Sequence, residues 1–196
     1  MTVHRLQSRV PSVEPAAWSS EMSHAYEQHS SQHLFRRQLD AQRGPGNLVQ
    51  ILANNPSLYR VWSEFATGLH LVRQMPKRDK ELSILRVAWR CNAPFAWQAH
   101  VKRGLALGVT AEEIERVKAG SDAVGWDAFD RHLLRAVDEL HDEGIISDDT
   151  WSALSQRYNY AQLIEFPMIV GFYHLMAFLL NSLRVPQDGD AERQSE

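Results

Sequence analysis

The chain has 196 residues, of which 44% are hydrophobic, and carries a formal net charge of −3. This length can bury a sizeable core, and the slightly acidic balance argues against nucleic acid as a partner, since nucleic-acid binders carry basic surfaces. A single cysteine excludes an intramolecular disulfide framework, a cysteine-rich zinc site and a Cys-x-x-Cys redox pair.

Two apolar features bear on where the protein resides. The opening segment, MTVHRLQSRVPSVEPAAW, has no apolar core of signal-peptide length, so we expect a cytoplasmic protein. The most apolar stretch, residues 168–180, is interrupted by Gly171, Tyr173 and His174 and is shorter than a membrane span requires. We therefore expect a buried helix there and no membrane association.

Helical signals recur along the chain, and strand signals are nearly absent. Residues 18–39 predict a polar, His-rich surface helix, which a Gly- and Pro-containing break at 43–47 separates from a short apolar piece, 48–52. Asn55-Pro56 predicts the start of an amphipathic helix, with Asn as the cap and Pro in the first position.

The second half of the chain predicts a central helix and a series of capped helices. Residues 79–89 are apolar on nearly all sides after the first turn, which is typical of a helix packed centrally. A further helix begins near Pro94 and ends at Gly108, and Thr110 with Glu113 forms a capping box for the next. Helices follow at 127–143, after Ser147, and at 161–183.

These elements predict an all-α fold. The domain proper is expected at residues 44–186, preceded by an N-terminal helical extension at 1–43. Residues 187–196, QDGDAERQSE, have no apolar anchor and are expected to be a disordered tail.

The segment ELSILRVAWRCNAPFAWQAHVKRGLALGVTAEEI, residues 81–114, carries a specific pattern. It has a Glu at a helix start, a break at 92–94, then a helix with a His, a following basic residue, and a Gly-Val-Thr-x-Glu-Glu-Ile cap. In this order the features closely resemble the carboxymuconolactone decarboxylase superfamily, which includes the alkylhydroperoxidases. The resemblance covers about residues 44–186 and implies an alkylhydroperoxidase-like helical fold of about seven to nine helices, assembled as a homotrimer or homohexamer.

The chain departs from the peroxidase members of that superfamily at the thiols. The positions of their Cys-x-x-Cys pair are occupied by Ala93 and Ala96 in this chain, and Cys91 lies two residues before Ala93. The Tyr-Glu-Trp of other members is matched by Phe95-Ala96-Trp97, which retains only the Trp. Thiol peroxidase chemistry needs a reactive thiolate and usually a resolving thiol, so we expect it to be absent, although family membership suggests peroxidase-like activity.

Glu81 and His100 are the candidate catalytic residues. In the relatives that the chain resembles, these two positions belong to a proton relay, and a carboxylate can orient an imidazole and stabilise its charged form. Such a pair can move a proton beside a carbonyl or protonate the carbanion that remains after carbon dioxide leaves. A buried hydrogen bond with no catalytic role is the alternative explanation of the same spacing.

Four residues are candidates for substrate binding. Trp97 lies three residues before His100 and shares its helix face, Phe95 lies in the matched motif, and His174 could line a pocket from the last helix. Arg86 is one of several cations on these helices that could hold a substrate carboxylate; the others are Arg90, Lys102 and Arg103.

The remaining histidines give weaker signals. His29 and His33, at i and i+4 with His24 and Glu27 nearby, could share a metal ion, but a solvated helix face explains them as well. The prediction is therefore no metal and no cofactor. His132 and His141, on an acidic amphipathic helix, are expected at the surface.

The leading interpretation is an enzyme of lyase or decarboxylase type that uses acid–base chemistry on a small carboxylated or lactone-like substrate. The alternative is a catalytically silent helical protein of the same fold that binds a small molecule. A transcription regulator is a third class, because GVTAEEIERV resembles the first helix of a helix-turn-helix, but the following SDAVGWDAFD is acidic where a recognition helix is basic.

Overall fold

The computed structural model describes residues 8–31, 44–72 and 74–188. Within these ranges every regular element is helical, with nine α-helices and one short 3₁₀ helix, which confirms the predicted all-α class. The chain divides into two compact units: an N-terminal unit, Met1–Val72 with Leu180–Glu196, and a central unit, Arg73–Leu179. The domain boundary expected at 43/44 stays a prediction.

The N-terminal unit contains the 3₁₀ helix η1 (Pro15–Ala17), α1 (Ser20–Ser31), α3 (Asn47–Leu52) and α4 (Pro56–Val72). The predicted start of α4 is confirmed, because the Asn55 side chain accepts a hydrogen bond from the backbone N–H of Leu58 at 3.1 Å. The predicted helix at 18–39 is described only as far as Ser31, and its remainder lies outside the described residues. Of the predicted tail, Asp188 is described and accepts a hydrogen bond from the backbone N–H of Asn47 at 2.8 Å.

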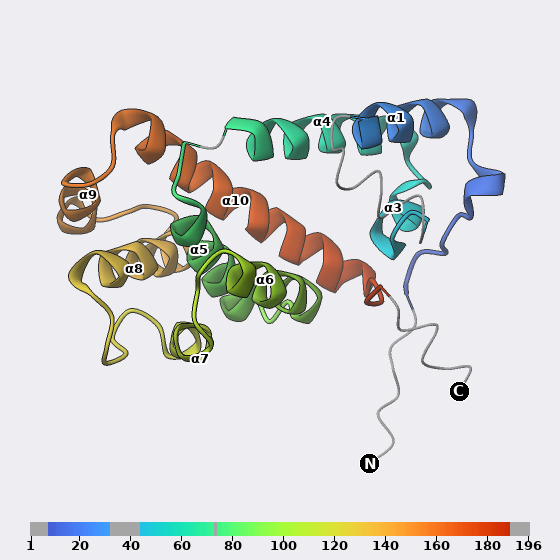
Figure 1. Ribbon diagram of the computed structural model, residues 1–196. Coiled ribbons are helices and arrows are strands. Elements are labelled where there is room, and N and C mark those ends of the chain that lie inside the picture. Colours follow the sequence, from blue (N-terminus) through green and yellow to red (C-terminus); the bar gives the residue numbers. More distant parts are fainter. Residues whose placement is uncertain (1–7, 32–43, 73, 189–196) are drawn as a thin grey trace, which may run out of the picture. The chain divides into compact units, whose positions relative to one another are not determined.

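The central unit is built around α5 (Lys77–Arg90). Ten consecutive residues of α5, Asp79–Ala88, are buried, and five of them are polar or charged. The burial on all sides confirms the predicted central helix. The helices α6 (Pro94–Ala106), α7 (Ala111–Ala119) and α8 (Ala128–Asp142) all pack against it (Figure 1). The short α9 (Asp148–Ser155) packs against α8, and α10 (Tyr160–Leu183) follows.

Local capping sets the ends of these helices. The predicted capping box of α7 is confirmed, with the Thr110 hydroxyl accepting from the Glu113 N–H and the Glu113 carboxylate accepting from the Thr110 N–H. Asn159 and Gln162 form the same reciprocal arrangement at the start of α10, with both bonds at 3.0 Å.

The last helix confirms the helix predicted at residues 161–183. It runs for 24 residues, Tyr160–Leu183, and the reciprocal cap at Asn159 begins it. By length and composition α10 could cross a membrane, and half of its most apolar 18-residue window is buried within the protein.

Candidate functional site

The turn between α5 and α6 folds the second helix back along the first. Asn92 adopts a left-handed conformation (φ 47°), and the N–H groups of Asn92 and Ala93 donate to the carbonyls of Trp89 and Ala88. This is the Schellman arrangement, with Asn in the position that glycine usually takes. Pro94 then begins α6 at once, since it needs no hydrogen-bond acceptor for its nitrogen.

This hairpin brings the two predicted catalytic residues together. Glu81 lies about 15 Å along α5 from the turn, and His100 lies about 12 Å along α6 from it. The two residues therefore lie at similar heights on the two helices. The Nδ1 atom of His100 lies 2.7 Å from Oε2 of Glu81, which confirms the predicted contact. Glu81 is 1% exposed and His100 8% exposed, so the bond forms away from bulk water.

Arg103 completes the arrangement. Its Nε atom lies 3.1 Å from Oε1 of Glu81, so each carboxylate oxygen has a cationic or N–H partner. A buried carboxylate without such partners would be strongly disfavoured. Because Arg103 compensates the charge of Glu81, the neutral His100 ring can donate its Nδ1–H to Glu81 and leave Nε2 as a lone pair.

The rest of the His100 ring faces α10. The Tyr173 ring packs edge-on against it, with the ring centroids 5.0 Å apart. Within the described part of the chain, Nε2 of His100 forms no hydrogen bond. A histidine held by a carboxylate at one nitrogen and open at the other has the arrangement of a general base or acid.

Arg86 is committed to the fold rather than to a ligand. Its Nε and Nη2 atoms donate to the two oxygens of Asp138 at 2.7 and 3.0 Å. Its Nη1 atom donates to the carbonyls of Val117 and Lys118 at 2.8 and 3.0 Å. All three guanidinium nitrogens are therefore occupied within the chain, and Arg86 joins α5 to α7 and α8 instead of facing His100.

The described contacts of Trp97 are with Trp89 and Lys118. Its ring packs against Trp89 of α5 at 5.3 Å, and the Lys118 ammonium of α7 lies over both rings. Phe95 is half-buried in the first turn of α6. Among the predicted lining residues, neither is brought to the His100 ring by any described contact.

His174 joins a second cluster instead of lining a pocket at His100. Its Nε2 atom lies 2.9 Å from Nδ1 of His141, and Sγ of Cys91 lies 3.9 Å from the same Nδ1. His141 is half-buried, so its predicted place at the surface is wrong: it turns inward to contact α10. Burial lowers the pKa of His141, with a further contribution from Arg90, and burial raises the pKa of the Cys91 thiol.

The histidine pair in the N-terminal region that was weighed as a metal site is only partly described. His33 lies outside the described residues, and the Nδ1 atom of His29 is hydrogen-bonded to the Thr67 hydroxyl at 2.9 Å. A cavity of about 320 Å³ lies between α1 and α4 and includes His29, Arg60 and Thr67 in its lining. This cavity belongs to the N-terminal unit and does not include Glu81 or His100.

Two contacts of the site were not assigned from the sequence. Arg103 was one of four candidate cations, and its i+3 spacing from His100 was the available signal that both share a face of α6. Tyr173, and not its neighbour His174, meets the His100 ring. No local signal separates these two residues, because the rotation of α10 about its axis decides which one faces α6.

Comparisons with known proteins agree with this geometry. Residues 56–139 match the family model described as "Carboxymuconolactone decarboxylase family". No curated protein matches the chain in sequence.

Three solved structures share the fold at low sequence identity. One is described as an alkylhydroperoxidase AhpD core, an uncharacterized peroxidase-related protein from Ralstonia eutropha JMP134 (TM-score 0.76, 14% identity, 93% of each chain covered). Another is a cysteine-to-alanine variant of the debrominase Bmp8 in complex with 2,3,4-tribromopyrrole (TM-score 0.70, 11% identity, 97% of each chain covered). A third is a protein of unknown function from Agrobacterium tumefaciens (TM-score 0.63, 15% identity, 71% of this chain and 96% of that chain covered).

The family match covers α4 to α8 and therefore includes both Glu81 and His100, while the shared fold extends over nearly the whole chain. On these findings the chain has an alkylhydroperoxidase-like fold, and its residues 56–139 resemble the carboxymuconolactone decarboxylase family.

Proposed function

We propose that the protein is an enzyme in which His100 transfers a proton to or from carbon in a small carboxylated or lactone-like substrate. The observation that supports this most directly is the 2.7 Å contact between Nδ1 of His100 and the buried Glu81 carboxylate, with the opposite ring nitrogen left without a described partner. Oriented imidazoles of this kind serve as general acids and bases near neutral pH.

The reaction can be written with these residues alone. As a base, Nε2 of His100 takes a proton from the carbon beside a carbonyl, and the electron pair moves onto the carbonyl oxygen as an enolate. As an acid, the charged ring returns a proton to the carbanion left when a carboxylate departs as carbon dioxide. In both directions Glu81 stabilises the charged ring through Nδ1.

Arg103 is the best-placed residue to bind a substrate carboxylate. Its side chain is 52% exposed, and only its Nε atom is used by Glu81. Its two Nη atoms form no bond with another described residue, so they remain available for an incoming anion. Arg86, the cation first considered for this role, is fully occupied by Asp138 and backbone carbonyls.

A small substrate is consistent with the relatives. The debrominase Bmp8 of the same fold was crystallised with 2,3,4-tribromopyrrole, a small planar ring. We carry over from it only the size of the ligand, since this chain has alanines at 93 and 96 and a single cysteine.

The test is turnover of a panel of carboxylated lactones and β-keto acids, followed by release of carbon dioxide and by proton exchange at the carbon beside the carbonyl. We expect His100→Ala to remove most turnover with the fold and oligomer unchanged. Glu81→Gln should lower turnover less and change its pH dependence, because the carboxylate only tunes the imidazole. Gln98→Ala, an exposed change on the same helix, is the matched control.

Two outcomes would contradict the proposal. Saturable binding of panel compounds with no turnover by the native protein would indicate the alternative, a catalytically silent binding protein. Equal losses of folding stability in His100→Ala and Glu81→Gln, of roughly 1–3 kcal/mol and with turnover of the folded fraction unchanged, would assign the pair a structural role.

A further inference from the structure

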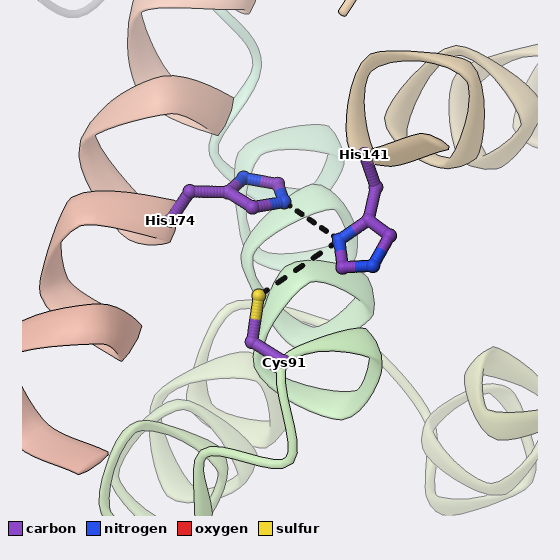
Figure 2. Close-up of side chains that lie close together, drawn as sticks. All are labelled: Cys91, His141 and His174. Carbon is purple, nitrogen blue, oxygen red and sulfur yellow. Dashed lines mark hydrogen bonds between the residues drawn. The ribbon is translucent and has the colours of Figure 1, made fainter. Parts of the chain in front are cut away.

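A second cluster of reactive side chains lies in the central unit, outside the Glu81–His100 site. Cys91 follows the last turn of α5, His141 ends α8, and His174 stands on α10. Figure 2 shows the three side chains pointing toward one another from these separate helices. Their ligand atoms, Sγ of Cys91, Nδ1 of His141 and Nε2 of His174, all lie within 4.8 Å of one another.

The hydrogen bond that His174 makes to the backbone leaves a nitrogen lone pair directed toward the centre of the cluster. Nδ1 of His174 lies 2.8 Å from the Val170 carbonyl, and a carbonyl only accepts, so Nδ1 carries the proton. In the neutral ring Nε2 is then a lone pair, directed at His141. An imidazole that donates its other N–H to a backbone carbonyl is the usual orientation of a metal-binding histidine.

A single proton lies between the two imidazoles of the cluster. Nδ1 of His141 lies 2.9 Å from the His174 lone pair, so in the neutral rings it must donate its proton there. Sγ of Cys91 lies 3.9 Å from the same Nδ1, whose proton is directed at His174. A metal ion in place of that proton would satisfy the lone pairs of all three atoms at once.

The spacing fits a tetrahedral ion. With Zn–S about 2.3 Å and Zn–N about 2.0 Å, neighbouring ligand atoms of a tetrahedral zinc site lie about 3.3–3.6 Å apart. The observed N–N and S–N separations of 2.9 and 3.9 Å fall on either side of that range. Small side-chain rotations would therefore form the site without moving the helices.

The surrounding charges and exposure allow a cation to enter. All three residues are partly exposed, which leaves a position for solvent as a fourth ligand. Arg90, a cation whose charge acts on Cys91 and His141, is paired with Asp138 and Asp142 of α8. Its charge is therefore balanced by two carboxylates on the helix that carries His141.

We propose that Cys91, His141 and His174 bind one Zn²⁺ ion, with solvent in the fourth position. One thiolate and two imidazoles suit zinc and related transition metals, whereas magnesium and calcium require oxygen ligands. Binding would release the Cys91 thiol proton and leave the His141 proton on Nε2 of that ring. The sequence did not reveal this site, because its ligands are 50 and 33 residues apart.

Cobalt substitution provides a site-specific test. Because Cys91 is the only cysteine, a thiolate-to-cobalt charge-transfer band in the near ultraviolet can arise only at this site. Titrating the chelator-treated full chain with Co²⁺ should develop the band to one ion per chain, and added Zn²⁺ should remove it. Cys91→Ser should abolish the band, and His141→Gln and His174→Gln should each weaken Co²⁺ binding on the order of 100-fold.

Two controls separate this site from the other histidines and from the proposed catalysis. His24→Ala, an exposed change on α1, should leave the band unchanged. His100→Ala should also leave it unchanged, so that loss of catalysis and loss of metal binding are distinguishable.

A second measurement does not depend on the variants folding. Alkylation of Cys91 in the native chain should slow at least tenfold when stoichiometric Zn²⁺ is present, because the thiolate lone pair is then bound. Absence of the charge-transfer band together with an alkylation rate that Zn²⁺ leaves unchanged would overturn the proposal. A band that persists undiminished in folded His141→Gln and His174→Gln would do the same.

Discussion

Glu81 shows how a buried charge is kept in this protein. Its two oxygens are bound by His100 at 2.7 Å and by Arg103 at 3.1 Å, so both carboxylate oxygens have partners although the residue is only 1% exposed. The pairing also selects the His100 proton at Nδ1, which is the condition for Nε2 to act as a base. One residue therefore links the stability of the helix pair to the chemistry proposed for it.

At the residue scale we expect no thiol-dependent peroxidase activity. Cys91 has no second cysteine to resolve a sulfenic acid, and burial raises the pKa of its thiol, which lowers the thiolate fraction at neutral pH. Incubating the metal-free protein with cumene hydroperoxide and dithiothreitol should consume no more peroxide than dithiothreitol alone. Robust reduction that is lost in Cys91→Ser would show that an external thiol completes the cycle.

A buried carboxyl on α5 should make stability depend on pH. Asp79 accepts hydrogen bonds from Tyr158 at 2.8 Å and pairs with Arg157 at 3.1 Å, yet burial, the largest effect, raises its pKa. A carboxyl with a raised pKa in the folded state stabilises the fold at pH values below its unfolded pKa. That contribution is lost as the pH rises through the folded pKa.

Asp79→Asn removes this titration. We expect the free energy of unfolding of the variant, relative to the native protein, to become more favourable as the pH rises from about 4 to about 7. Urea unfolding across that range measures the difference, and Asp148→Asn, an exposed change on α9, serves as the control. Parallel pH profiles for the native protein and Asp79→Asn would contradict the assignment.

At the scale of elements, Arg86 holds three helices together. Its guanidinium on α5 binds Asp138 on α8 and the last carbonyls of α7, and 7% of the residue is exposed. The close approach at the end of α7 requires Gly120, whose φ is 87° and where an added Cβ would lie 2.6 Å from Nη2 of Arg86. The positive φ and the contact both exclude a side chain there.

Replacing Arg86 should therefore lower stability. Arg86→Ala removes both of its bonds to the partly buried Asp138, which keeps Arg90 as a partner, and removes the donor to the Lys118 carbonyl. We expect a loss of about 1–3 kcal/mol in the free energy of unfolding. Arg86→Lys should recover little of the lost stability, because an ammonium group cannot form the two parallel hydrogen bonds that a guanidinium makes to a carboxylate. Arg131→Ala, exposed on α8, should change stability by less than about 0.5 kcal/mol. Unchanged stability of Arg86→Lys with a raised KM would instead indicate a substrate contact.

At the scale of the whole molecule, α10 leaves a stripe of large apolar side chains exposed. They recur at the spacing of one helix face: Tyr160, Ile164, Met168, Leu175 and Phe178. A continuous apolar face of this kind is typical of an interface with another chain. It supports the expectation of a homo-oligomer, a trimer or hexamer by resemblance to the family.

Light scattering at micromolar concentration should show no monomer. Introducing charge into the stripe, as in Ile164→Glu combined with Phe178→Glu, should shift the population toward monomers, because these side chains are 68% and 62% exposed in the single chain. Gln98→Glu adds charge to an exposed position on α6 and should leave the assembly intact. A native protein that scatters light as a monomer would refute the expectation.

The sequence by itself determined the helical class, most helix ends and the principal contact of the candidate site. Caps such as Asn55-Pro56 and Thr110 with Glu113 act within one turn, so their residues predict their own geometry. Glu81 and His100 were also predictable, because they lie on consecutive helices joined by a tight turn and their heights follow from the helical rise.

Only the tertiary structure decided which residues from distant helices meet. Arg86 finds Asp138 52 residues away, Tyr173 rather than His174 reaches His100, and His174 instead joins Cys91 and His141. Each of these outcomes depends on the rotation and crossing of helices that are not neighbours in sequence. Helical periodicity shows which residues share a face, but the packing of the whole core selects the partner that face meets.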